Sequence, residues 1–165
     1  QAGDEVLVQS FTFCASSHPV TYLGAKPVFV GSEKDTWNMD PVLLEEAIKD
    51  RMEKTGKKPK AIVPVALYGM PYDCERIMEI ANRYDIPVVE DAAEGFGSKF
   101  DGRVLGTFGK FGVLSFNGNK MITTSGGGAL ICRNAEDKIP LCGMLLRHAM
   151  LILIISIRQS ATIIV

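Results

Sequence analysis

Short apolar runs of strand length alternate with helix-like segments along this chain, and this alternation limits the possible folds more than any other feature. The runs cover residues 5–9, 27–30, 61–65, 88–91, 111–116 and 128–132, and the run at 27–30 is expected to be a buried strand. Strands that alternate with helices at this spacing build a sheet that is mostly parallel and flanked by helices on both faces. The sequence therefore predicts an α/β fold whose ligands bind at the carboxyl ends of the strands.

Capping residues mark where the helices between these runs begin and end. A first helix is predicted over residues 15–23, with Gly24 just past its C-terminal end. Asp40 caps a second helix that has proline at its first position, and Asp73 caps a third helix that closes near Asp85. The second helix is expected to carry one apolar stripe, formed by Leu43, Leu44, Ala47, Ile48 and Met52.

Composition and charge argue against several classes of partner. The 165 residues carry a net charge of −1 without a basic block, so nothing suggests a nucleic-acid partner. Four cysteines without a C-x-x-C pair, together with two histidines, argue against a metal site. Free thiols suit a reducing compartment, so a cytoplasmic location is expected. The most apolar segment, residues 149–157, is too short to cross a membrane, which takes about 20 residues.

Asp91 stands at the end of the apolar run 88–91. A carboxylate there is partly removed from water, which is costly unless it is paired. A protonated pyridine nitrogen would be a suitable partner, because it stabilises the ionised acid. An acid in this position can equally cap the next turn, and the residue alone does not decide between these interpretations.

Lys120 lies in the stretch S-F-N-G-N-K, which begins at Ser115 and is followed two residues later by T-T-S-G-G-G. Small residues allow a backbone to approach a ligand closely. A lysine that forms an imine and an acid that pairs with a pyridinium nitrogen are the groups that pyridoxal phosphate chemistry needs most. A lysine in a polar loop is, however, more often solvated surface. Ser115 could donate to a phosphate or be an ordinary serine at a strand end.

Two further residues allow a functional and a structural interpretation. Phe13 could stack on a cofactor ring, although most such aromatic residues belong to a core. Glu94 could bind the cofactor's phenolic oxygen or face solvent. The glycine run does not have the P-loop form, and the segment around Gly95 and Gly97 does not complete G-x-G-x-x-G. A nicotinamide-dependent Rossmann enzyme is therefore disfavoured.

Taken together, the motifs of this chain resemble those of the DegT/StrS-like sugar-nucleotide aminotransferases. The shared motifs are G-D-E-V at 3–6, S-F-T-F at 10–13, Y-L-G-A-K-P-V-F at 22–29, L-Y-G at 67–69, E-D-A-A-E at 90–94 and the stretch 115–128. They follow in consistent order over roughly residues 1–138. Within the family, Glu94 and the runs N-G-N-K and T-T-S-G-G-G look most similar to the transaminases of the UDP-N-acetylbacillosamine pathway.

The resemblance implies a partial large domain of pyridoxal-phosphate fold type I and a set of residue roles. Lys120 would form the imine with pyridoxal 5'-phosphate and shuttle a proton, and Asp91 would hold the pyridinium. Phe13 would stack on the ring, Ser115 would bind the phosphate, and Glu94 would contact the ring hydroxyl. The substrates would be glutamate and a 4-keto-6-deoxy sugar nucleotide used for surface polysaccharide or glycan. The intact enzyme would be a homodimer with its active site at the subunit interface.

The two ends of the chain do not follow the family pattern. The start has neither a methionine nor a signal peptide, so residues 1–139 are expected to be the central part of the large domain, entered after the family's phosphate loop. Residues 140–165 form an aberrant tail. Possible codons for 143–149 and 159–165 spell, in a second reading frame, Y-A-T-Q-A-R and I-G-Y-N-Y-R, as the family would continue. We therefore expect a frameshift near residues 139–141 and an inactive fragment.

A non-enzymatic function is the alternative for this chain. A truncated remnant, or a binding or regulatory module on the same fold, would keep the motifs without turnover. Cofactor binding that depends on Lys120 would favour the enzyme. Absence of binding in the fragment, with binding in a repaired full-length chain, would favour the remnant.

Overall fold

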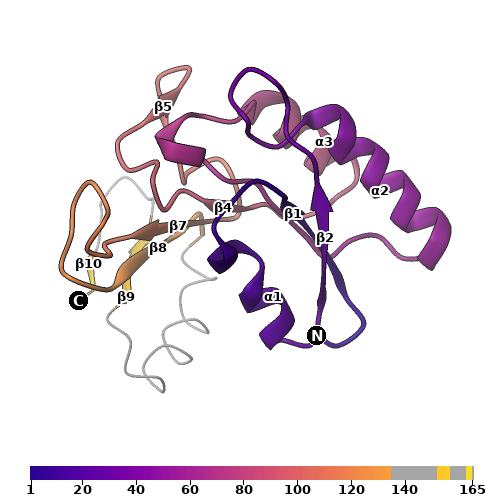
Figure 1. The fold of residues 1–165 in the computed structure, drawn as a ribbon, viewed down its shortest axis with the longest axis horizontal. Helices are drawn as coiled ribbons and strands as arrows, with labels where there is room; N and C mark the ends of the chain where they lie inside the picture. Colours follow the sequence, from indigo (N-terminus) through magenta and orange to yellow (C-terminus); the bar gives the residue numbers. More distant parts are fainter. Residues whose placement is uncertain (135–151, 157–162, 165) are drawn as a thin grey trace.

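The structure, a computed structural model, describes residues 1–134, 152–156 and 163–164. Its strands are β1 (Glu5–Gln9), β2 (Lys26–Val30), β3 (Ala61–Val63), β4 (Val89–Asp91), β5 (Lys99–Phe100), β6 (Arg103–Val104), β7 (Phe111–Ser115), β8 (Gly128–Cys132), β9 (Ile152–Ser156) and β10 (Ile163–Ile164). Its α-helices are α1 (His18–Tyr22), α2 (Pro41–Thr55) and α3 (Cys74–Arg83), and its 3-10 helices are η1 (Cys14–Ser16) and η2 (Leu67–Gly69). The predicted alternation of strands and helices is present (Figure 1).

Eight of the strands form two ladders that meet between β3 and β4, and β5 and β6 form a separate antiparallel pair. One ladder has the order β2-β1-β3 and the other β10-β9-β8-β7-β4. Two parallel bridges, Ile62 with Val88 and Val65 with Asp91, join the ladders into one continuous layer. β1 pairs in parallel with β2 and β3, and β4 pairs in parallel with β7, whereas β8 is antiparallel to β7. The prediction of a mostly parallel sheet is confirmed for this part of the chain.

Alternate residues of β1 face the two sides of this layer, as the period of a strand requires. Leu7 belongs to the main core, which contains Leu44 and Ile48 of α2 and Ile77 of α3. Val8 belongs to a smaller cluster with Val20 of α1 and Ala25. Figure 1 shows α2 and α3 on one side of the strands and α1 on the other. Each fully buried Leu or Ile contributes about 1.5–3 kcal/mol, so the α2–α3 face supplies most of the stabilisation.

Helix α2 begins as the sequence predicts. The Asp40 side chain accepts hydrogen bonds from the N–H groups of Val42 and Leu43, and proline occupies the first helical position. The predicted apolar stripe is correct only in its centre, where Leu44 and Ile48 are fully buried. Leu43 and Met52, at its ends, are 38% and 42% exposed. The helix therefore meets the sheet over a shorter length than its apolar pattern indicates.

The predicted helix over residues 15–23 is wrong in its extent. A 3-10 turn, Cys14–Ser16, and a short α-helix, His18–Tyr22, occupy the region, and Ser17 has φ −105° where they meet. Gly24 follows with φ +72°, in the left-handed conformation that glycine adopts without steric cost. Its N–H donates to the carbonyl of Thr21, and the N–H of Ala25 donates to that of Val20, which completes a Schellman motif.

Strand β2 is not a buried strand, contrary to the prediction. It pairs with β1 on one side and is the edge of its ladder in the described part of the chain. Phe29 is 56% exposed, and only Val30 of this strand is fully buried. An edge position leaves one side of a strand without a neighbour, so an apolar composition did not ensure burial here.

The apolar segment at 149–157 contributes β9, which pairs in parallel with β8. The expected boundary at residue 139 and the expected frameshift at 139–141 lie outside the described residues. Both remain predictions. Within the described ranges, no helix is long and apolar enough to cross a membrane.

Candidate functional site

The predicted site residues gather at the carboxyl ends of the parallel strands. Asp91 is the last residue of β4, and Ser115 is the last residue of the neighbouring strand β7. Asp91 is in register with Val113, two residues before Ser115. β1 runs parallel to β3, and through the bridges to β4 and β7, and leads at its carboxyl end into the loop that holds Phe13. This is the edge of an α/β sheet where ligands bind.

Two hydrogen bonds fix the orientation of the Asp91 carboxylate. The Ser16 hydroxyl donates to Asp91 Oδ2 at 2.6 Å, and the backbone N–H of Ala93 donates to Oδ1 at 3.2 Å. Thr12 Oγ1 lies 2.7 Å from Ser16 Oγ, so the two hydroxyls share a further hydrogen bond. The loop after β1 therefore holds the acid at the end of β4.

The neighbouring acid, Glu90, faces the opposite side of the strand and has a structural role. It is fully buried and accepts hydrogen bonds from the N–H groups of Gly106 at 2.8 Å and Gly109 at 2.6 Å. Burial raises the pKa of the Tyr72 hydroxyl, and the negative charge of Glu90 raises it further. Of the two consecutive acids, only Asp91 is thus placed at the ligand edge.

Lys120 and Glu94 form an ion pair at this edge. Lys120 Nζ lies 3.2 Å from Glu94 Oε1, and the two side chains are 16% and 33% exposed. The other Glu94 oxygen accepts the backbone N–H of Tyr68 at 2.8 Å. Tyr68 has φ +51°, a left-handed conformation that is unusual for a large side chain. Glu94 therefore joins the lysine to the η2 turn.

Phe13 and Ser115 lie at the same edge, where each contacts neighbouring backbone. Phe13 is 77% exposed, and its carbonyl accepts a hydrogen bond from the N–H of Ser16. Ser16 is the residue whose hydroxyl binds Asp91. Ser115 Oγ accepts the N–H of Asn117 at 3.3 Å, which leaves the hydroxyl hydrogen able to donate to a ligand. The structure thus joins Lys120 directly to Glu94 and joins Phe13 to Asp91 through Ser16.

Gln9 is a buried support of the site that the sequence did not reveal. It is fully buried, and its Oε1 accepts the N–H groups of Met39 at 2.8 Å and Val65 at 3.2 Å. Its Nε2 donates to the carbonyl of Phe11 at 2.9 Å and approaches Asn38 Oδ1 at 3.5 Å. All of its polar atoms are therefore used to fix the loops around the end of β1.

Asn38 extends this support to the η2 turn. It is also fully buried, its Oδ1 accepts the N–H of Leu67 at 3.0 Å, and its Nδ2 donates to the carbonyl of Met70 at 3.0 Å. Leu67 and Met70 flank Tyr68, whose N–H binds Glu94. Ser16, Thr12, Tyr68, Gln9 and Asn38 are the site-supporting residues that sequence reasoning missed. The motif around Thr12 was noted, but nothing in it indicated that Thr12 would bond Ser16, which in turn binds an acid 75 residues further along the chain.

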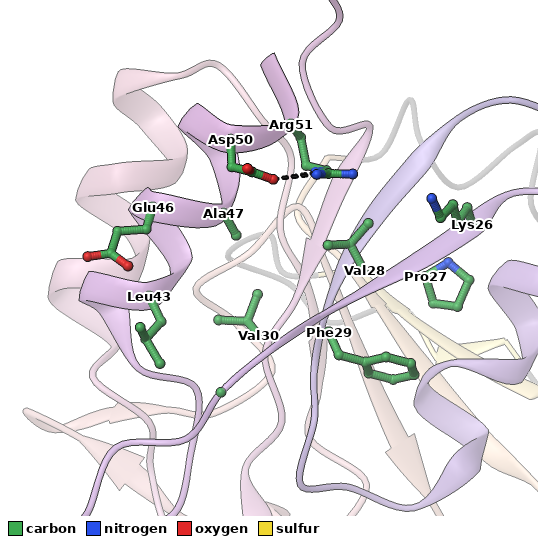
Figure 2. Close-up of a pocket in the computed structure, with 11 residues that line it drawn as sticks. Lys26, Pro27, Val28, Phe29, Val30, Leu43, Glu46, Ala47, Asp50 and Arg51 are labelled. Carbon is green, nitrogen blue, oxygen red and sulfur yellow. Dashed lines mark hydrogen bonds and ion pairs between the residues drawn. The ribbon is translucent and has the colours of Figure 1, made fainter. Parts of the chain in front are cut away.

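A groove of about 620 Å³ lies away from these residues, between β2 and α2 (Figure 2). Its walls include Phe29 and Val28 on the strand and Leu43 and Ala47 on the helix. Asp50 and Arg51, which form an ion pair, stand at one end. None of the predicted site residues lines this groove, so it is not the candidate site.

The side chains at the strand-end edge match the chemistry of a phosphorylated pyridine aldehyde. An amine, a carboxylate held by two donors, an exposed aromatic ring and a serine hydroxyl are all present at the carboxyl ends of β1, β4 and β7 or in the loops that follow them. Among the described residues, no three His, Cys, Asp or Glu side chains form a group that could hold a metal ion. The donor set therefore fits an organic cofactor with one basic ring nitrogen.

Comparisons with known proteins agree with this chemistry. The profile of the DegT/DnrJ/EryC1/StrS aminotransferase family matches residues 1–151. A Bacillus subtilis protein assigned to the pyridoxal phosphate-dependent aminotransferases is 50% identical over 129 residues, which are 78% of this chain and 33% of that protein. The GDP-perosamine synthase of Escherichia coli O157:H7 is 45% identical over 129 residues, 78% of this chain and 34% of that protein.

A solved structure shows the same arrangement of elements. The crystal structure of a DegT/DnrJ/EryC1/StrS aminotransferase from Brucella abortus superposes with a TM-score of 0.74 at 40% identity. The superposition covers 77% of this chain and 34% of that one. The chain thus spans about one third of the length of the relatives it matches.

Proposed function

The chain belongs to the DegT/DnrJ/EryC1/StrS aminotransferase family, and we propose that it is the cofactor-holding part of a pyridoxal phosphate-dependent sugar-nucleotide aminotransferase. The chain has the α/β architecture of the large domain of fold type I. The observation that carries the proposal is the contact of Lys120 with Glu94, three residues beyond an Asp91 that Ser16 holds in place.

The residues at the strand ends would divide the work of such an enzyme. Pyridoxal phosphate, when bound, supplies a ring that withdraws electrons from the carbon bearing the amino group. Lys120 would attach the cofactor covalently and move a proton to and from the reacting carbon. Asp91 would hold the ring nitrogen, and Phe13 would cover one face of the ring. Ser115 would donate to the phosphate, and Glu94 would contact the ring hydroxyl.

We further propose a 4-keto-6-deoxy sugar nucleotide as the acceptor and glutamate as the amino donor. The relative named GDP-perosamine synthase supports a sugar carried on a nucleotide. A homodimer, a cytoplasmic location and a place in surface polysaccharide synthesis belong to the same proposal, as does the narrower assignment to the bacillosamine pathway. We expect the chain as given to be inactive in turnover, because it spans one third of its relatives.

Covalent capture of the cofactor tests the proposal without requiring turnover. The chain is incubated with pyridoxal phosphate, reduced with borohydride and mapped by peptide mass spectrometry. We expect the adduct on the peptide containing Lys120, its loss in Lys120→Ala and its retention in Lys99→Ala, which removes an exposed lysine of β5. Adducts spread evenly over exposed lysines would contradict the assigned role. No adduct here, with an adduct in a full-length chain, would favour the non-catalytic remnant.

A further inference from the structure

We propose that Phe11 and Trp37 form a binding subsite for the nucleobase of a nucleoside diphosphate. The inference rests on the proposed function, because it names where the nucleotide of the sugar-nucleotide substrate would bind. The two rings have their centroids 5.7 Å apart at 58°. They are 48% and 60% exposed, and both line a pocket of about 370 Å³. Exposed aromatic faces of this kind stack on bases of any identity.

The backbone holds Trp37 in a strained conformation on a fixed loop. Its φ is +64°, a left-handed value that costs a residue with a Cβ atom about 1–2 kcal/mol. Ser32 and Met39 form an antiparallel bridge below it, and the Glu33 carboxylate accepts the N–H and hydroxyl of Thr36. A large apolar side chain kept outward at such a cost is typical of a ligand-binding position.

The polar groups around the two rings suit a phosphorylated ligand. Ser10, Ser32 and Lys34 line the pocket together with the aromatic pair. The Ser32 hydroxyl is buried and has no hydrogen-bond partner within the described part of the chain. A buried hydroxyl without a partner is uncommon, and rotation toward the pocket would give it one on a bound ligand. Lys34 provides a cation at the same opening, where a diphosphate would be favoured.

Two routes join this pocket to the proposed reaction site, one along the loop after β1 and one through the hydrogen bonds of Asn38. Phe11 begins the loop that continues to Ser16, which holds Asp91. Trp37 precedes Asn38, which binds Leu67 and Met70 on either side of the η2 turn, and Tyr68 of that turn binds Glu94. A nucleotide whose base stacks on the exposed face of this aromatic pair would therefore lie at the same strand-end edge as the cofactor residues. This placement suits a substrate whose sugar reacts at the cofactor residues while its base stays in the pocket of Phe11 and Trp37.

The experiment uses Trp37 as its own reporter, because the chain contains one tryptophan. Indole fluorescence of the full chain is titrated with UDP, dTDP and GDP, and separately with inorganic pyrophosphate. We expect saturable quenching by nucleoside diphosphates and none by pyrophosphate. Phe11→Ala should weaken the binding roughly tenfold, the usual effect of removing one stacking partner. Phe11→Leu should weaken it to a similar extent, because bulk is kept but the aromatic face is lost.

Matched variants separate this inference from the proposed function. Phe29→Ala removes an equally exposed ring from the β2 groove and should leave the quenching unchanged. Lys120→Ala should lose the cofactor adduct but keep the quenching, whereas Phe11→Ala should keep the adduct and require higher nucleotide concentrations for the same quenching. Absence of quenching, equal quenching by pyrophosphate, or unchanged affinity in both Phe11 variants would overturn the nucleobase subsite. Quenching without any cofactor adduct would leave the subsite standing and count against the aminotransferase proposal alone.

Discussion

Ser16 donates its hydroxyl to Asp91 Oδ2 across 2.6 Å, which joins the loop after β1 to the end of β4. The two residues are 75 positions apart in the sequence, and each belongs to a different ladder of the sheet. The acid proposed to hold the cofactor ring is therefore oriented by a residue that no motif around Asp91 contains.

Replacing Ser16 should weaken cofactor binding more than it weakens the fold. Ser16→Ala removes a hydrogen bond to a charged group, worth about 1.5–3 kcal/mol, so we expect roughly tenfold weaker capture of pyridoxal phosphate. Ser16→Thr keeps the hydroxyl and should restore capture. The measurement is the concentration of pyridoxal phosphate that gives half of the maximal adduct. Ser17→Ala, which removes a hydroxyl bonded to the Cys14 carbonyl, is the control, and an equal loss there would refute the role of Ser16.

Replacing Glu94 should loosen the backbone at Tyr68. The N–H of Tyr68 donates to a Glu94 oxygen, and the residue is 82% exposed, so this bond is the main protection of that amide. Glu94→Ala should accelerate its hydrogen exchange roughly tenfold, whereas Glu94→Gln keeps an oxygen acceptor and should change it little. Residue-resolved exchange by nuclear magnetic resonance provides the measurement. Similar exchange in all three proteins would show that Glu94 does not hold the turn.

Replacing Gln9 should destabilise the whole chain. Gln9→Leu leaves the buried N–H groups of Met39 and Val65 without their acceptor, at about 1–3 kcal/mol each. We expect a loss of about 2–5 kcal/mol in the free energy of unfolding, measured from the urea midpoint at unchanged slope. Ser10→Ala, at the exposed neighbouring position, should cost less than about 0.5 kcal/mol. A Gln9→Leu variant as stable as the parent would mean that these bonds are not formed.

The thiol of Cys74 should be unreactive in the folded protein. Burial raises its pKa to about 12, from an ordinary value of 9.0, and the side chain is inaccessible, whereas Cys14 is exposed. At pH 8 a thiol reagent should label Cys14 quickly and Cys74 only after unfolding. Peptide mapping reads the two sites separately. Rapid labelling of Cys74 without urea would contradict its burial.

The raised pKa of the Cys74 thiol leads us to expect a loss of stability at alkaline pH. A group whose pKa is higher in the folded state than in the unfolded state stabilises the fold fully below the unfolded value. For Cys74 this contribution is complete below about pH 9 and is lost as the pH rises toward about 12. Urea midpoints measured across that window should fall more steeply for the parent than for Cys74→Ala. Parallel curves would show that the buried thiol does not contribute.

Local rules explain which parts of the fold could be predicted from sequence. Asp40 and Gly24 act through bonds to residues no more than four positions away, so their sequence neighbourhood was sufficient. The exposure of Phe29 depends on the order of strands in the sheet, which the sequence of β2 does not contain. The division of residues 15–23 into a 3-10 turn and a short helix accompanies the contact of Ser16 with Asp91, which the apolar spacing of that segment does not encode.

The candidate site also contains residues that the sequence indicated and residues that only the structure shows. Lys120 and Glu94 were assigned to one cofactor by family resemblance, and the structure brings their side chains into contact. Their cofactor roles, and those of Phe13, Asp91 and Ser115, stay predictions. The supporting amides of Gln9 and Asn38 could not be foreseen, because a buried amide is recognisable only when the loops that it binds have been placed.

The edge position of β2 has a consequence for the behaviour of the chain in solution. The backbone N–H of Lys26 points toward β1 and donates to the Asp4 carbonyl. The backbone of the next residue therefore points away from β1, toward the open side of β2. That residue is Pro27, which has no N–H to offer. Within β2, Phe29 is then the residue whose backbone N–H points to the open side of the strand. A strand of another molecule would find one N–H donor fewer along this rim, and a proline at such a position is one way in which edge strands limit pairing with other chains.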